Sequence, residues 1–339
     1  MEVICAGTPH ALFPMGDASR VGEARRHAAQ LSARLALDET TAGRLALVVT
    51  ELGNNLVRHA QAGRLLIAQR QHDQPEVEVL ALDDGPGIAN PARALVDGFS
   101  TGGTPGTGLG AVRRLASDFD LHSEPGVGTV VLARVRPEGL RRTPQAFRWG
   151  AVMLCAPGER VCGDAWALAL DGASAAVLMA DGLGHGPQAA EASQAAVAQF
   201  AQAPFAPLAS QLERMHGALR ITRGAAASLA WLEPGRLSLA GAGNIATRLV
   251  SGTHSKSLAA QHGTLGLQVR RFEPVHTDWP PHAVAVLHSD GLQSRWAAEP
   301  LAPRVARDPA LLAAWLVRGN LRGRDDATVL VVQRNTNGR

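Results

Sequence analysis

The chain has 339 residues, 46% of them hydrophobic, with 33 basic and 30 acidic side chains. This length predicts two domains of about 150 residues each, and the scattered basic residues argue against nucleic-acid binding. No apolar run is long enough to span a membrane, and the N-terminus lacks the pattern of a signal peptide. Cys5, Cys155 and Cys162 show neither metal-ligand spacing nor a disulfide framework, so we expect a cytoplasmic protein without a membrane partner.

The first half of the chain predicts helices and strands in a regular order. Val3 to Ala6 has the pattern of a short edge strand. Asp17 is expected to cap a helix that runs to about Leu35, and Asp38 a second helix that Gly63 ends. Apolar alternation predicts a strand pair and a last hairpin: 64–71, 76–82, 119–123 and 129–135. We therefore expect an α+β layer with helices on one face of a mixed or antiparallel sheet.

A polar stripe marks the second predicted helix. Glu51, Asn55 and His59 fall at positions i, i+4 and i+8, beside the apolar face formed by Leu45, Leu52 and their neighbours. A carboxylate and an amide one turn apart suit Mg²⁺, which prefers oxygen ligands and keeps waters and phosphates. A stripe of this kind in isolation is more often a solvated face, so the interpretation depends on the motifs that follow.

The stretch from Leu82 to Val112 contains two glycine motifs. A strand delivers Asp83 to its end, and Asp83-Asp84-Gly85-Pro86-Gly87-Ile88 then turns tightly. After a Gly-rich loop, Gly106-Thr107-Gly108-Leu109-Gly110 runs into a helical pattern. A glycine loop that opens a helix is suited to phosphate, because unpaired N–H groups and the positive end of the helix dipole face the anion.

This glycine loop is open to three other interpretations. Residues 106–111 satisfy the loose dinucleotide pattern G-x-G-x-x-G/A, but 99–105 do not form the strand that this motif requires. A P-loop needs a lysine, which is absent here. A mobile surface loop is the remaining alternative.

Taken together, E-x-x-x-N, D-x-G-x-G-I and G-x-G-x-G in this order resemble the ATP-binding domain shared by gyrase, Hsp90, histidine kinases and MutL. Within this group, the sequence most resembles the small serine kinases of bacterial partner-switching systems, of the anti-sigma-factor and RsbT type. The segments Asp97–Thr101 and Arg113–Phe119 strengthen this resemblance. The resemblance implies a GHKL (Bergerat-type) α/β sandwich that binds ATP with Mg²⁺.

The same resemblance assigns roles to single residues. Asn55 would hold Mg²⁺, Asp83 would bind the adenine amino group, and Thr129 would hydrogen-bond near the adenine. Glu51 would be the base that activates an attacking hydroxyl, in a phosphoryl transfer that depends mostly on positioning and charge neutralisation. The remaining positions would shape the pocket and close over the phosphates: Gly85, Gly87, Gly106, Gly108 and Gly110.

A polar segment with Pro and Gly, Arg136 to Pro144, predicts a short linker. We expect an ATP-binding domain at 1–137, a linker at 138–147, a second domain at 148–335 and a tail at 336–339. The linker is too short for a long flexible tether.

Apolar strands in the second half have aspartates beside their ends. Asp164, Asp181, Asp290 and Asp325 each lie next to such a strand, although they are far apart in sequence. One Asp-Gly pair alone is usually a turn signal. Four carboxylates whose strand ends converge would need cations to neutralise them, and carboxylate oxygens select Mg²⁺ or Mn²⁺ over Zn²⁺. Two such ions can acidify a bridging water and clamp a phosphate.

This half, roughly Trp149 to Arg334, resembles bacterial PP2C phosphatases of the SpoIIE and RsbX type. The motifs that carry the resemblance are Cys162-Gly163-Asp164, Asp181 to Gly186, Gly241 to Ile245, Gly263 to Gly266, Ser289-Asp290-Gly291 and Asp325 to Thr328. The resemblance implies a PP2C-like α/β/β/α sandwich with two Mn²⁺ or Mg²⁺ ions.

Residue roles follow from this second resemblance. Asp181 and the carbonyl of Gly182 would bind metal, Asp290 and Asp325 would complete the set, and Asp164 would support the second ion. Asp326, one position later, is less suited to direct ligation.

No residue matches the arginine with which eukaryotic PP2C relatives hold phosphate. Arg160 is a weak candidate and Arg148 a weaker one. His185 is open to two interpretations, a substrate contact or acid, or a solvated loop histidine.

The sequence therefore predicts a partner-switching regulator with protein serine kinase activity and metal-dependent phosphoserine and phosphothreonine phosphatase activity. By resemblance, its substrates or partners would be STAS-domain antagonists or RsbR/RsbS-like scaffold proteins. The alternative is a phosphatase whose first domain only binds ATP and a partner protein. An ATPase of the gyrase or MutL kind is disfavoured, because the chain has no room for their transducer domain.

Overall fold

The structure is a computed structural model that describes residues 3–70, 75–96, 108–140, 145–269, 271–296, 301, 304 and 307–335. The chain divides into two compact units. One unit is His10–Arg142, and the other joins Met1–Pro9 to Thr143–Arg339. Among the described residues, no helix has the length and apolar character needed to cross a membrane.

Two capped helices form one layer of the His10–Arg142 unit. Helix α1 (Ala18–Arg34) begins after Asp17, whose carboxylate accepts a hydrogen bond from the Ser19 N–H at 2.7 Å. Helix α2 (Glu39–His59) begins after Asp38, which accepts from the Thr41 N–H at 2.9 Å. Both predicted caps are therefore confirmed.

The predicted end of the second helix is wrong. Helix α2 ends at His59 with Ala60 as its C-cap, and Ala62 takes the left-handed backbone conformation at φ 49°. Gly63 has another reason to lack a side chain: a β-carbon there would lie 3.1 Å from the β-carbon of Leu56. The glycine thus marks a close approach to the helix rather than its termination.

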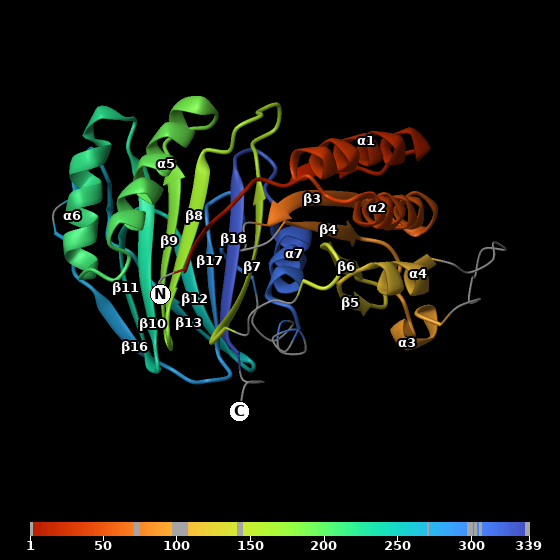
Figure 1. Ribbon diagram of the computed structural model, residues 1–339. Helices are drawn as coiled ribbons and strands as arrows, with labels where there is room; N and C mark the ends of the chain where they lie inside the picture. The colour runs from red at the N-terminus through yellow and green to blue at the C-terminus, as the bar shows by residue number, and fades with distance from the viewer. Residues whose placement is uncertain are drawn as a thin grey trace. The chain divides into compact units, whose positions relative to one another are not determined.

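The sheet of this unit is wholly antiparallel, one of the two expected arrangements. Its order is β2 (Ala11–Pro14), β3 (Arg64–Arg70), β4 (Glu76–Asp83), β6 (Gly128–Val135) and β5 (Asp118–Glu124). Alternate strand residues such as Leu65, Val79 and Val131 share a core with α1 and α2, which lie side by side over one face (Figure 1). Two short helices, α3 (Pro91–Ala94) and α4 (Gly108–Leu115), complete the unit.

The opposite face of this sheet carries buried charges. Glu78 and Arg134 are 2% and 1% exposed, and Arg134 Nε donates to Glu78 Oε2 at 2.6 Å. Arg70 lies 3.7 Å from the same carboxylate, and Glu76 is also buried nearby. Burial alone would raise the pKa of Glu78, but the charges of Arg134 and Arg70 lower it well below its usual range.

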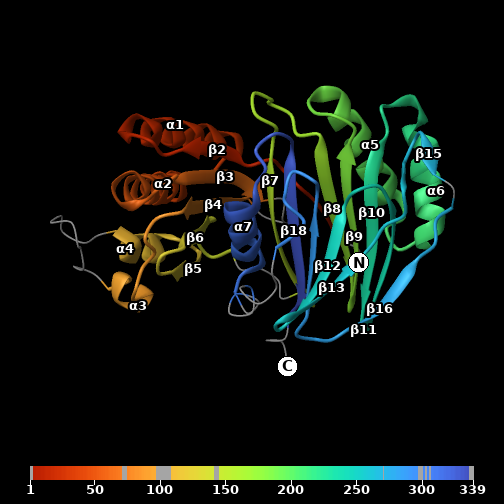
Figure 2. The same ribbon diagram turned by 180° about the vertical axis from the view of Figure 1, so that it is seen from behind.

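The second unit is a sandwich of two antiparallel sheets, with helices on both outer faces (Figures 1 and 2). One sheet has the order β1 (Val3–Ala6), β8 (Asp164–Asp171), β9 (Ser174–Gly182), β10 (Ala225–Glu233), β11 (Gly235–Ala242) and β16 (Val275–Trp279). The other has the order β13 (His254–Leu258), β12 (Ala246–Ser251), β17 (Val284–His288), β18 (Ala327–Arg334) and β7 (Phe147–Leu154). A separate two-stranded piece pairs β14 (Gly263–Thr264) with β15 (Gln268–Val269).

Three helices cover the sandwich. Helices α5 (Pro187–Gln202) and α6 (Leu208–Ala218), the latter followed by the 3₁₀ turn η1 (Leu219–Ile221), pack their apolar side chains against the first sheet. Helix α7 (Pro309–Asn320) packs on β7 and β18 of the second sheet. The inner faces meet in one core that includes Trp149, Leu168, Val177, Leu287 and Leu330. The α/β/β/α architecture predicted from the sequence is therefore confirmed.

The first strand of the chain belongs to this second unit. Strand β1 is an edge strand, as its pattern predicts, but it pairs with β8, Val3 opposite Leu170 and Ala6 opposite Ala167. The compact unit that contains the nucleotide motifs therefore begins at His10 rather than at residue 1.

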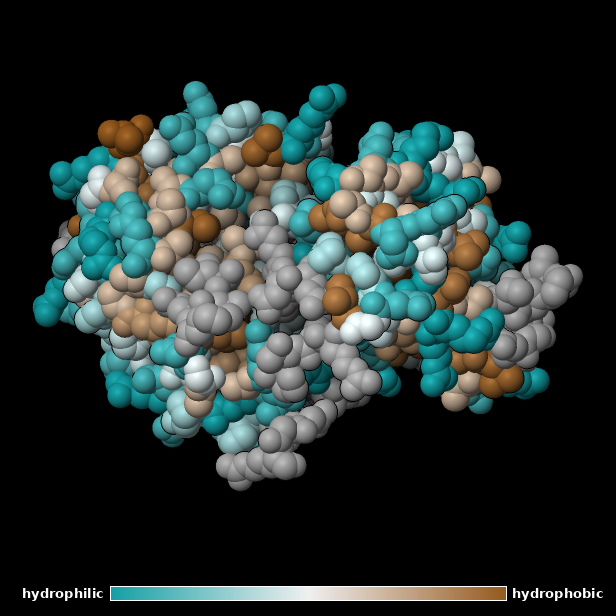
Figure 3. Space-filling model, in the orientation of Figure 1, coloured by the Kyte–Doolittle hydropathy of each residue, from teal (hydrophilic) through white to brown (hydrophobic). Residues whose placement is uncertain are grey.

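Exposed apolar side chains are dispersed on the face drawn in Figure 3, where brown residues stand in small separate patches among hydrophilic ones. Among the described residues, Ile221 is the most exposed large apolar side chain, at 90%. Scattered exposure of this kind is ordinary for a protein surface.

Candidate functional site

Helix α2 carries the first group of candidate residues. Glu51 and Asn55 lie one turn apart and are half-buried, and His59 is exposed at the end of the helix. Gly108 is the first residue of α4, and a β-carbon built there would lie 3.7 Å from the amide atoms of Asn55. The N-terminus of α4 therefore faces the side chain that the sequence predicts to hold Mg²⁺.

Strand β4 presents the second group at its end. Asp83 is half-buried, and its Oδ1 accepts a hydrogen bond from the Gly85 N–H at 2.8 Å. Its direct neighbour across the ladder is Thr129 of β6, which is 6% exposed. Thr129 Oγ1 lies 2.9 Å from Ser123 Oγ, which in turn accepts from the Ile88 N–H at 2.7 Å. Ser123 was not singled out by the sequence, because a lone serine in a strand carries no signal.

The glycine turn after Asp83 fits against the β5–β6 hairpin. Gly87 has φ +71°, and a β-carbon there would lie 2.2 Å from the carbonyl oxygen of Glu124. The Gly126 N–H donates to the Pro86 carbonyl at 2.8 Å, and the Asp84 N–H to the Gln61 carbonyl at 2.9 Å. The turn is thereby fixed between the hairpin and the residues that follow α2.

The remaining nucleotide-motif residues are only partly described. Gly110 is buried within α4. Gly106 and the segment 97–107 that contains it lie outside the described residues. The structure thus brings Asn55 beside Gly108, and Asp83 beside Thr129 and Gly85, while Glu51 lies one turn before Asn55 on the same helix.

In the second unit, antiparallel pairing brings two of the predicted aspartates together. Asp164 is the first residue of β8 and Asp181 the next-to-last of β9, and the register places them directly opposite one another. Gly182 is buried, and a β-carbon there would lie 2.0 Å from the Ala189 carbonyl oxygen, so α5 packs tightly against the strand end.

The other two aspartates lie beside the ends of strands in the second sheet. Asp290 comes two residues after the end of β17, and its Oδ2 accepts a hydrogen bond from the Asn244 amide at 2.7 Å. Asp325 comes two residues before β18, whose Val329 pairs with His288. The sheets are linked here, because Ser289 Oγ donates to Asp164 Oδ2 at 2.6 Å and accepts from the Thr328 N–H at 2.9 Å.

The pKa values of Asp164 and Asp181 show that these two carboxylates are affected by the charges of their acidic neighbours. Burial, together with the charges of Asp164 and Asp290, raises the pKa of Asp181 to about 9, and Asp325 adds to the effect. Burial and the charge of Asp290 raise the pKa of Asp164 to about 7, against the lowering effect of the hydrogen bond from Ser289. Crowded carboxylates of this kind resist ionisation unless a cation is present.

The donors around Asp164 are of the kind that a divalent metal ion prefers, although among the described residues no three of the four predicted aspartates bring carboxylate oxygens within 4.8 Å of one another. Asp164 Oδ1 and the neighbouring Thr328 hydroxyl are both buried, and neither makes a well-formed hydrogen bond. The Thr328 hydroxyl lowers the pKa of Asp164, but a buried carboxylate oxygen with only a poorly aligned partner is costly, and metal ligation is one way to satisfy it. All donors are oxygen atoms, which suits Mg²⁺ or Mn²⁺.

Asp326 is engaged differently from Asp325. Its Oδ1 accepts from the Ala156 N–H at 2.8 Å and its Oδ2 from the Gly163 N–H at 2.9 Å, and it is 3% exposed. Burial raises the pKa of Asp326, although these two N–H groups lower it. Its role is to fix the segment before β8, which agrees with the sequence-based view that it is a poor direct ligand.

The structure separates the arginine candidates. Arg148 lies in β7 six residues before Leu154, roughly 20 Å along the strand from the aspartate end, and its guanidinium lies 4.0 Å from Asp308. This contradicts its assignment to phosphate. Arg160 is exposed on the loop between β7 and β8.

Arg223 is a better-placed arginine that the sequence analysis missed. Its Nη1 lies 3.2 Å from the position of a β-carbon on Gly184, within the loop that follows Asp181, and the adjacent Gly224 carbonyl accepts from the Leu183 N–H. No motif surrounds it, so only the fold could reveal it. In the same loop, His185 Nδ1 lies 2.7 Å from Glu159 Oε1.

Comparisons with known proteins agree with the division of the chain. The family described as Histidine kinase-like ATPase domain matches residues 15–135, and the family described as Stage II sporulation protein E (SpoIIE) matches residues 171–335. Serine/threonine-protein kinase RsbT of Bacillus subtilis (strain 168) is 32% identical over 111 residues, which are 32% of this chain and 84% of the relative. The chain belongs to the RsbT family. It is an RsbT homologue with a SpoIIE domain in the same polypeptide.

Two solved structures are similar to the chain over a share larger than the RsbT-like domain. A structure described as the bacterial stressosome, a modular system adapted to control secondary messenger signaling, has 26% identity and a TM-score of 0.52 over 55% of this chain and 99% of that one. RsbX in complex with magnesium has 21% identity and a TM-score of 0.51 over 57% of this chain and 98% of that one. The SpoIIE domain thus has the PP2C-type serine/threonine phosphatase fold.

Proposed function

We propose that the chain is a partner-switching regulator that joins an ATP-binding protein serine kinase domain to a metal-dependent phosphoserine and phosphothreonine phosphatase domain. The observation that supports this most strongly is the pair Asp164 and Asp181, which lie directly opposite one another across the β8–β9 ladder and whose pKa values are raised by burial and by the charges of Asp290, Asp325 and Asp326. Such a cluster is costly for a fold and is explained by cation-dependent chemistry.

In the SpoIIE domain, one metal ion would be bound by Asp181, Asp290, Asp325 and the carbonyl of Gly182. Asp164 would support a second ion. Two Mn²⁺ or Mg²⁺ ions would supply Lewis acidity, which lowers the pKa of an attacking water and neutralises charge on a phosphoryl group. Ser289 holds the Asp164 carboxylate in place by donating to it, and the Asn244 amide does the same for Asp290. Arg223, whose Nη1 lies beside Gly184 in the loop after Asp181, would bind the phosphoryl group of a substrate.

In the RsbT-like domain, Asn55 would hold Mg²⁺ and Asp83 would accept from the adenine amino group, with Thr129 beside it. Bound ATP would supply the γ-phosphoryl group. Glu51, one turn before Asn55, would accept the proton of the substrate hydroxyl. The glycines at 85, 87, 106, 108 and 110 would shape the pocket and close over the phosphates.

The proposed substrates are STAS-domain antagonists or their RsbR/RsbS-like scaffold relatives, in the cytoplasm. A kinase and a phosphatase that act on one serine at equal rates only hydrolyse ATP. We therefore propose that the two domains act on different sites, or that nucleotide or partner binding favours one activity at a time.

Phosphatase activity is tested with the full chain and a phosphorylated STAS-domain protein. Phosphate release should require Mn²⁺ or Mg²⁺ and should be lost in Asp181→Ala and Asp290→Ala. Asp171→Ala, at the other end of the same strand pair, is the matched control and should retain activity. Metal-dependent turnover that persists in both active-site variants would refute the assignment.

Kinase activity is tested against the alternative of a purely ATP-binding regulatory module. With labelled ATP and a STAS-domain protein, the full chain should transfer phosphate, and Glu51→Ala should bind ATP without transferring it. If the unmodified chain binds ATP but labels no STAS-domain protein, the binding-module alternative holds.

A further inference from the structure

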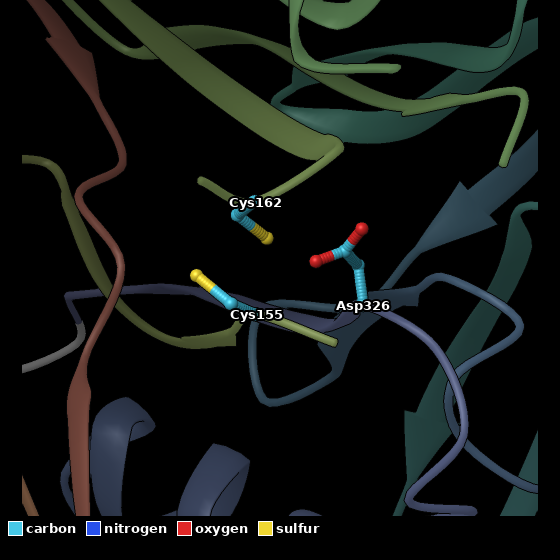
Figure 4. Close-up of side chains that lie close together, drawn as sticks. All are labelled: Cys155, Cys162 and Asp326. Carbon is cyan, nitrogen blue, oxygen red and sulfur yellow. The ribbon is translucent and has the colours of Figure 1, made fainter. Parts of the chain in front are cut away.

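Two cysteine side chains meet beside the aspartate cluster, although the sequence spacing gave no reason to pair them. Cys155 directly follows β7, and Cys162 lies two residues before Asp164. Both are free thiols, and their sulfur atoms and a carboxylate oxygen of Asp326 lie within 4.8 Å of one another. Figure 4 shows the three side chains close together, with the Cys162 sulfur directed toward the Asp326 carboxylate.

The two thiols differ in ways that suit a reactive pair. Cys162 is 3% exposed and donates to the Leu154 carbonyl at 3.4 Å, whereas Cys155 is partly exposed. The neighbouring Cys162 thiol lowers the pKa of Cys155, although burial and the charges of Asp326, Glu159 and Asp164 oppose this. A partly exposed thiol next to a second thiol is the arrangement found at oxidation-sensitive sites.

We propose that Cys155 and Cys162 are a reversible oxidation site, whose disulfide switches off the SpoIIE domain. The oxidant is hydrogen peroxide. The Cys155 thiolate attacks a peroxide oxygen, the O–O bond breaks, and hydroxide leaves and takes up a proton to become water. The Cys162 sulfur then attacks the sulfenic acid on Cys155, the S–O bond breaks, and a second water leaves with the thiol proton. Two thiols thus lose two electrons to one peroxide, and a dithiol reductant reverses the change by exchange.

The neighbourhood of Cys162 explains why the disulfide would affect the phosphatase. A disulfide bond is about 2.05 Å long, so sulfur atoms as far apart as these must approach by up to roughly 2.8 Å. The next residue, Gly163, donates to Asp326 and accepts from the Gly182 N–H at 3.1 Å. Asp164 follows directly. Pulling Cys162 toward Cys155 therefore strains the contacts that hold Asp164 opposite Asp181.

A soft divalent cation is the competing occupant, since two thiolates and a carboxylate can bind zinc. The geometry favours the disulfide, because both oxygens of Asp326 already accept backbone N–H groups and the Cys162 thiol already donates to a carbonyl. Zinc binding is therefore retained as an outcome of the test.

The covalent change is tested on the full chain. The reduced protein is treated with hydrogen peroxide, the remaining thiols are alkylated, and the peptides are mapped by mass spectrometry. We expect a linked pair of peptides containing Cys155 and Cys162, with the loss of two hydrogens, reversed by dithiothreitol. Cys155→Ser should form no link, and Cys5→Ser, a buried cysteine of β1 outside the cluster, should form it as the unmodified chain does. Cooperative melting verifies that each variant folds, and Cys155→Ala serves as a second variant.

The functional arm rests on the proposed phosphatase function. Metal-dependent hydrolysis of a phosphopeptide should fall on oxidation by about 10- to 100-fold, the usual effect of disturbing groups that orient metal ligands. Dithiothreitol should restore it, and Cys155→Ser should keep its activity in peroxide.

The outcomes separate the two claims. If the reduced chain hydrolyses nothing, the proposed function fails while the peptide map still decides the oxidation site. A disulfide that forms without loss of activity overturns the switch. Stoichiometric zinc binding that protects both thiols from peroxide and alkylation, or peroxide products without any Cys155–Cys162 link, overturns the oxidation site itself.

Discussion

Neutralising one aspartate of the SpoIIE domain should stabilise the metal-free protein. The pKa of Asp181 is raised to about 9 by burial and by the neighbouring carboxylates, whereas an aspartate in an unfolded chain has a pKa of about 3.9. The folded state therefore binds more protons than the unfolded state between these two values, so stability is lost as the pH rises from about 4 to about 9. Asp181→Asn removes this proton uptake while keeping the shape of the side chain.

The size of the effect follows from the same numbers. At pH 7 the raised pKa lowers the free energy of unfolding by about 4 kcal/mol. This is about 1.4 kcal/mol for each of the roughly three pH units between 3.9 and 7. Asp164 shares the same environment, so 4 kcal/mol is the upper bound. For a domain of this size, that corresponds to a rise in melting temperature of roughly 10 °C.

The assay is thermal unfolding of chelator-treated protein at about pH 5, 7 and 8, with and without Mn²⁺. Asp181→Asn should melt above the unmodified chain at pH 7 without metal, and the gap should shrink to about a third at pH 5, where only about one pH unit separates the solution from 3.9. The unmodified chain should gain stability on adding Mn²⁺, and the variant should gain little. Asp171→Asn, an exposed aspartate at the other end of β8, is the control. A variant that melts at or below the unmodified chain at pH 7 without metal would refute the electrostatic reasoning.

Two further predictions concern single contacts. Arg223→Ala should raise the KM of the SpoIIE domain for a phosphopeptide roughly tenfold, because a phosphate contact is lost, and it should leave the Mn²⁺-induced melting shift unchanged. Arg220→Ala, an exposed arginine in η1, should change neither, and equal KM values in both variants would exclude Arg223 from substrate binding. Glu78→Gln should destabilise the RsbT-like domain by about 3 kcal/mol at pH 7, because Arg134 keeps a buried charge without its closest partner. Glu78 has a lowered pKa, so its contribution is present above the usual glutamate pKa of about 4.3 and fades as the pH falls below it; a melting difference that grows in acid would contradict this.

The sequence could predict those features that depend on local pattern. Asp17 and Asp38 precede amphipathic segments, and a cap needs only the residues within one turn of it. The four aspartates could be expected to converge because each adjoins an apolar strand, and strands in a sandwich end at shared edges. Asp83 and Thr129 were linked by resemblance, and the antiparallel register places them opposite one another.

Features that depend on partners distant in sequence could not be predicted. Helix α7 is buried along residues 309–317, so it shows no polar stripe and no 3.6-residue period. The pair of Cys155 and Cys162 forms because two strand ends approach across a loop. Arg223 is distant in sequence from the loop after Asp181 and lies beside Gly184 of that loop only in the folded chain. Strand β1 has a correct local pattern, but four residues cannot specify which sheet they join.

The placement of β1 leads to a last prediction. The chain crosses between the two units at residues 9–10 and again at 142–143, so the SpoIIE domain is completed by a strand that precedes the RsbT-like domain. Gly7 follows β1, donates its N–H to the Trp166 carbonyl, and lies so close that a β-carbon would be 2.2 Å from the indole nitrogen of Trp166.

Gly7→Ala should therefore displace either β1 or Trp166, whose side chain belongs to the core between the sheets. Overpacking of this kind costs about 1–3 kcal/mol, or roughly 5 °C in the melting temperature of the SpoIIE domain. Gly16→Ala, whose β-carbon would meet nothing within 4 Å, is the matched control. If both variants have the melting temperature of the unmodified chain, β1 is not a structural part of the SpoIIE domain. If only Gly7→Ala loses stability, a SpoIIE domain expressed from residue 143 lacks an edge strand, and its activity underestimates that of the full chain.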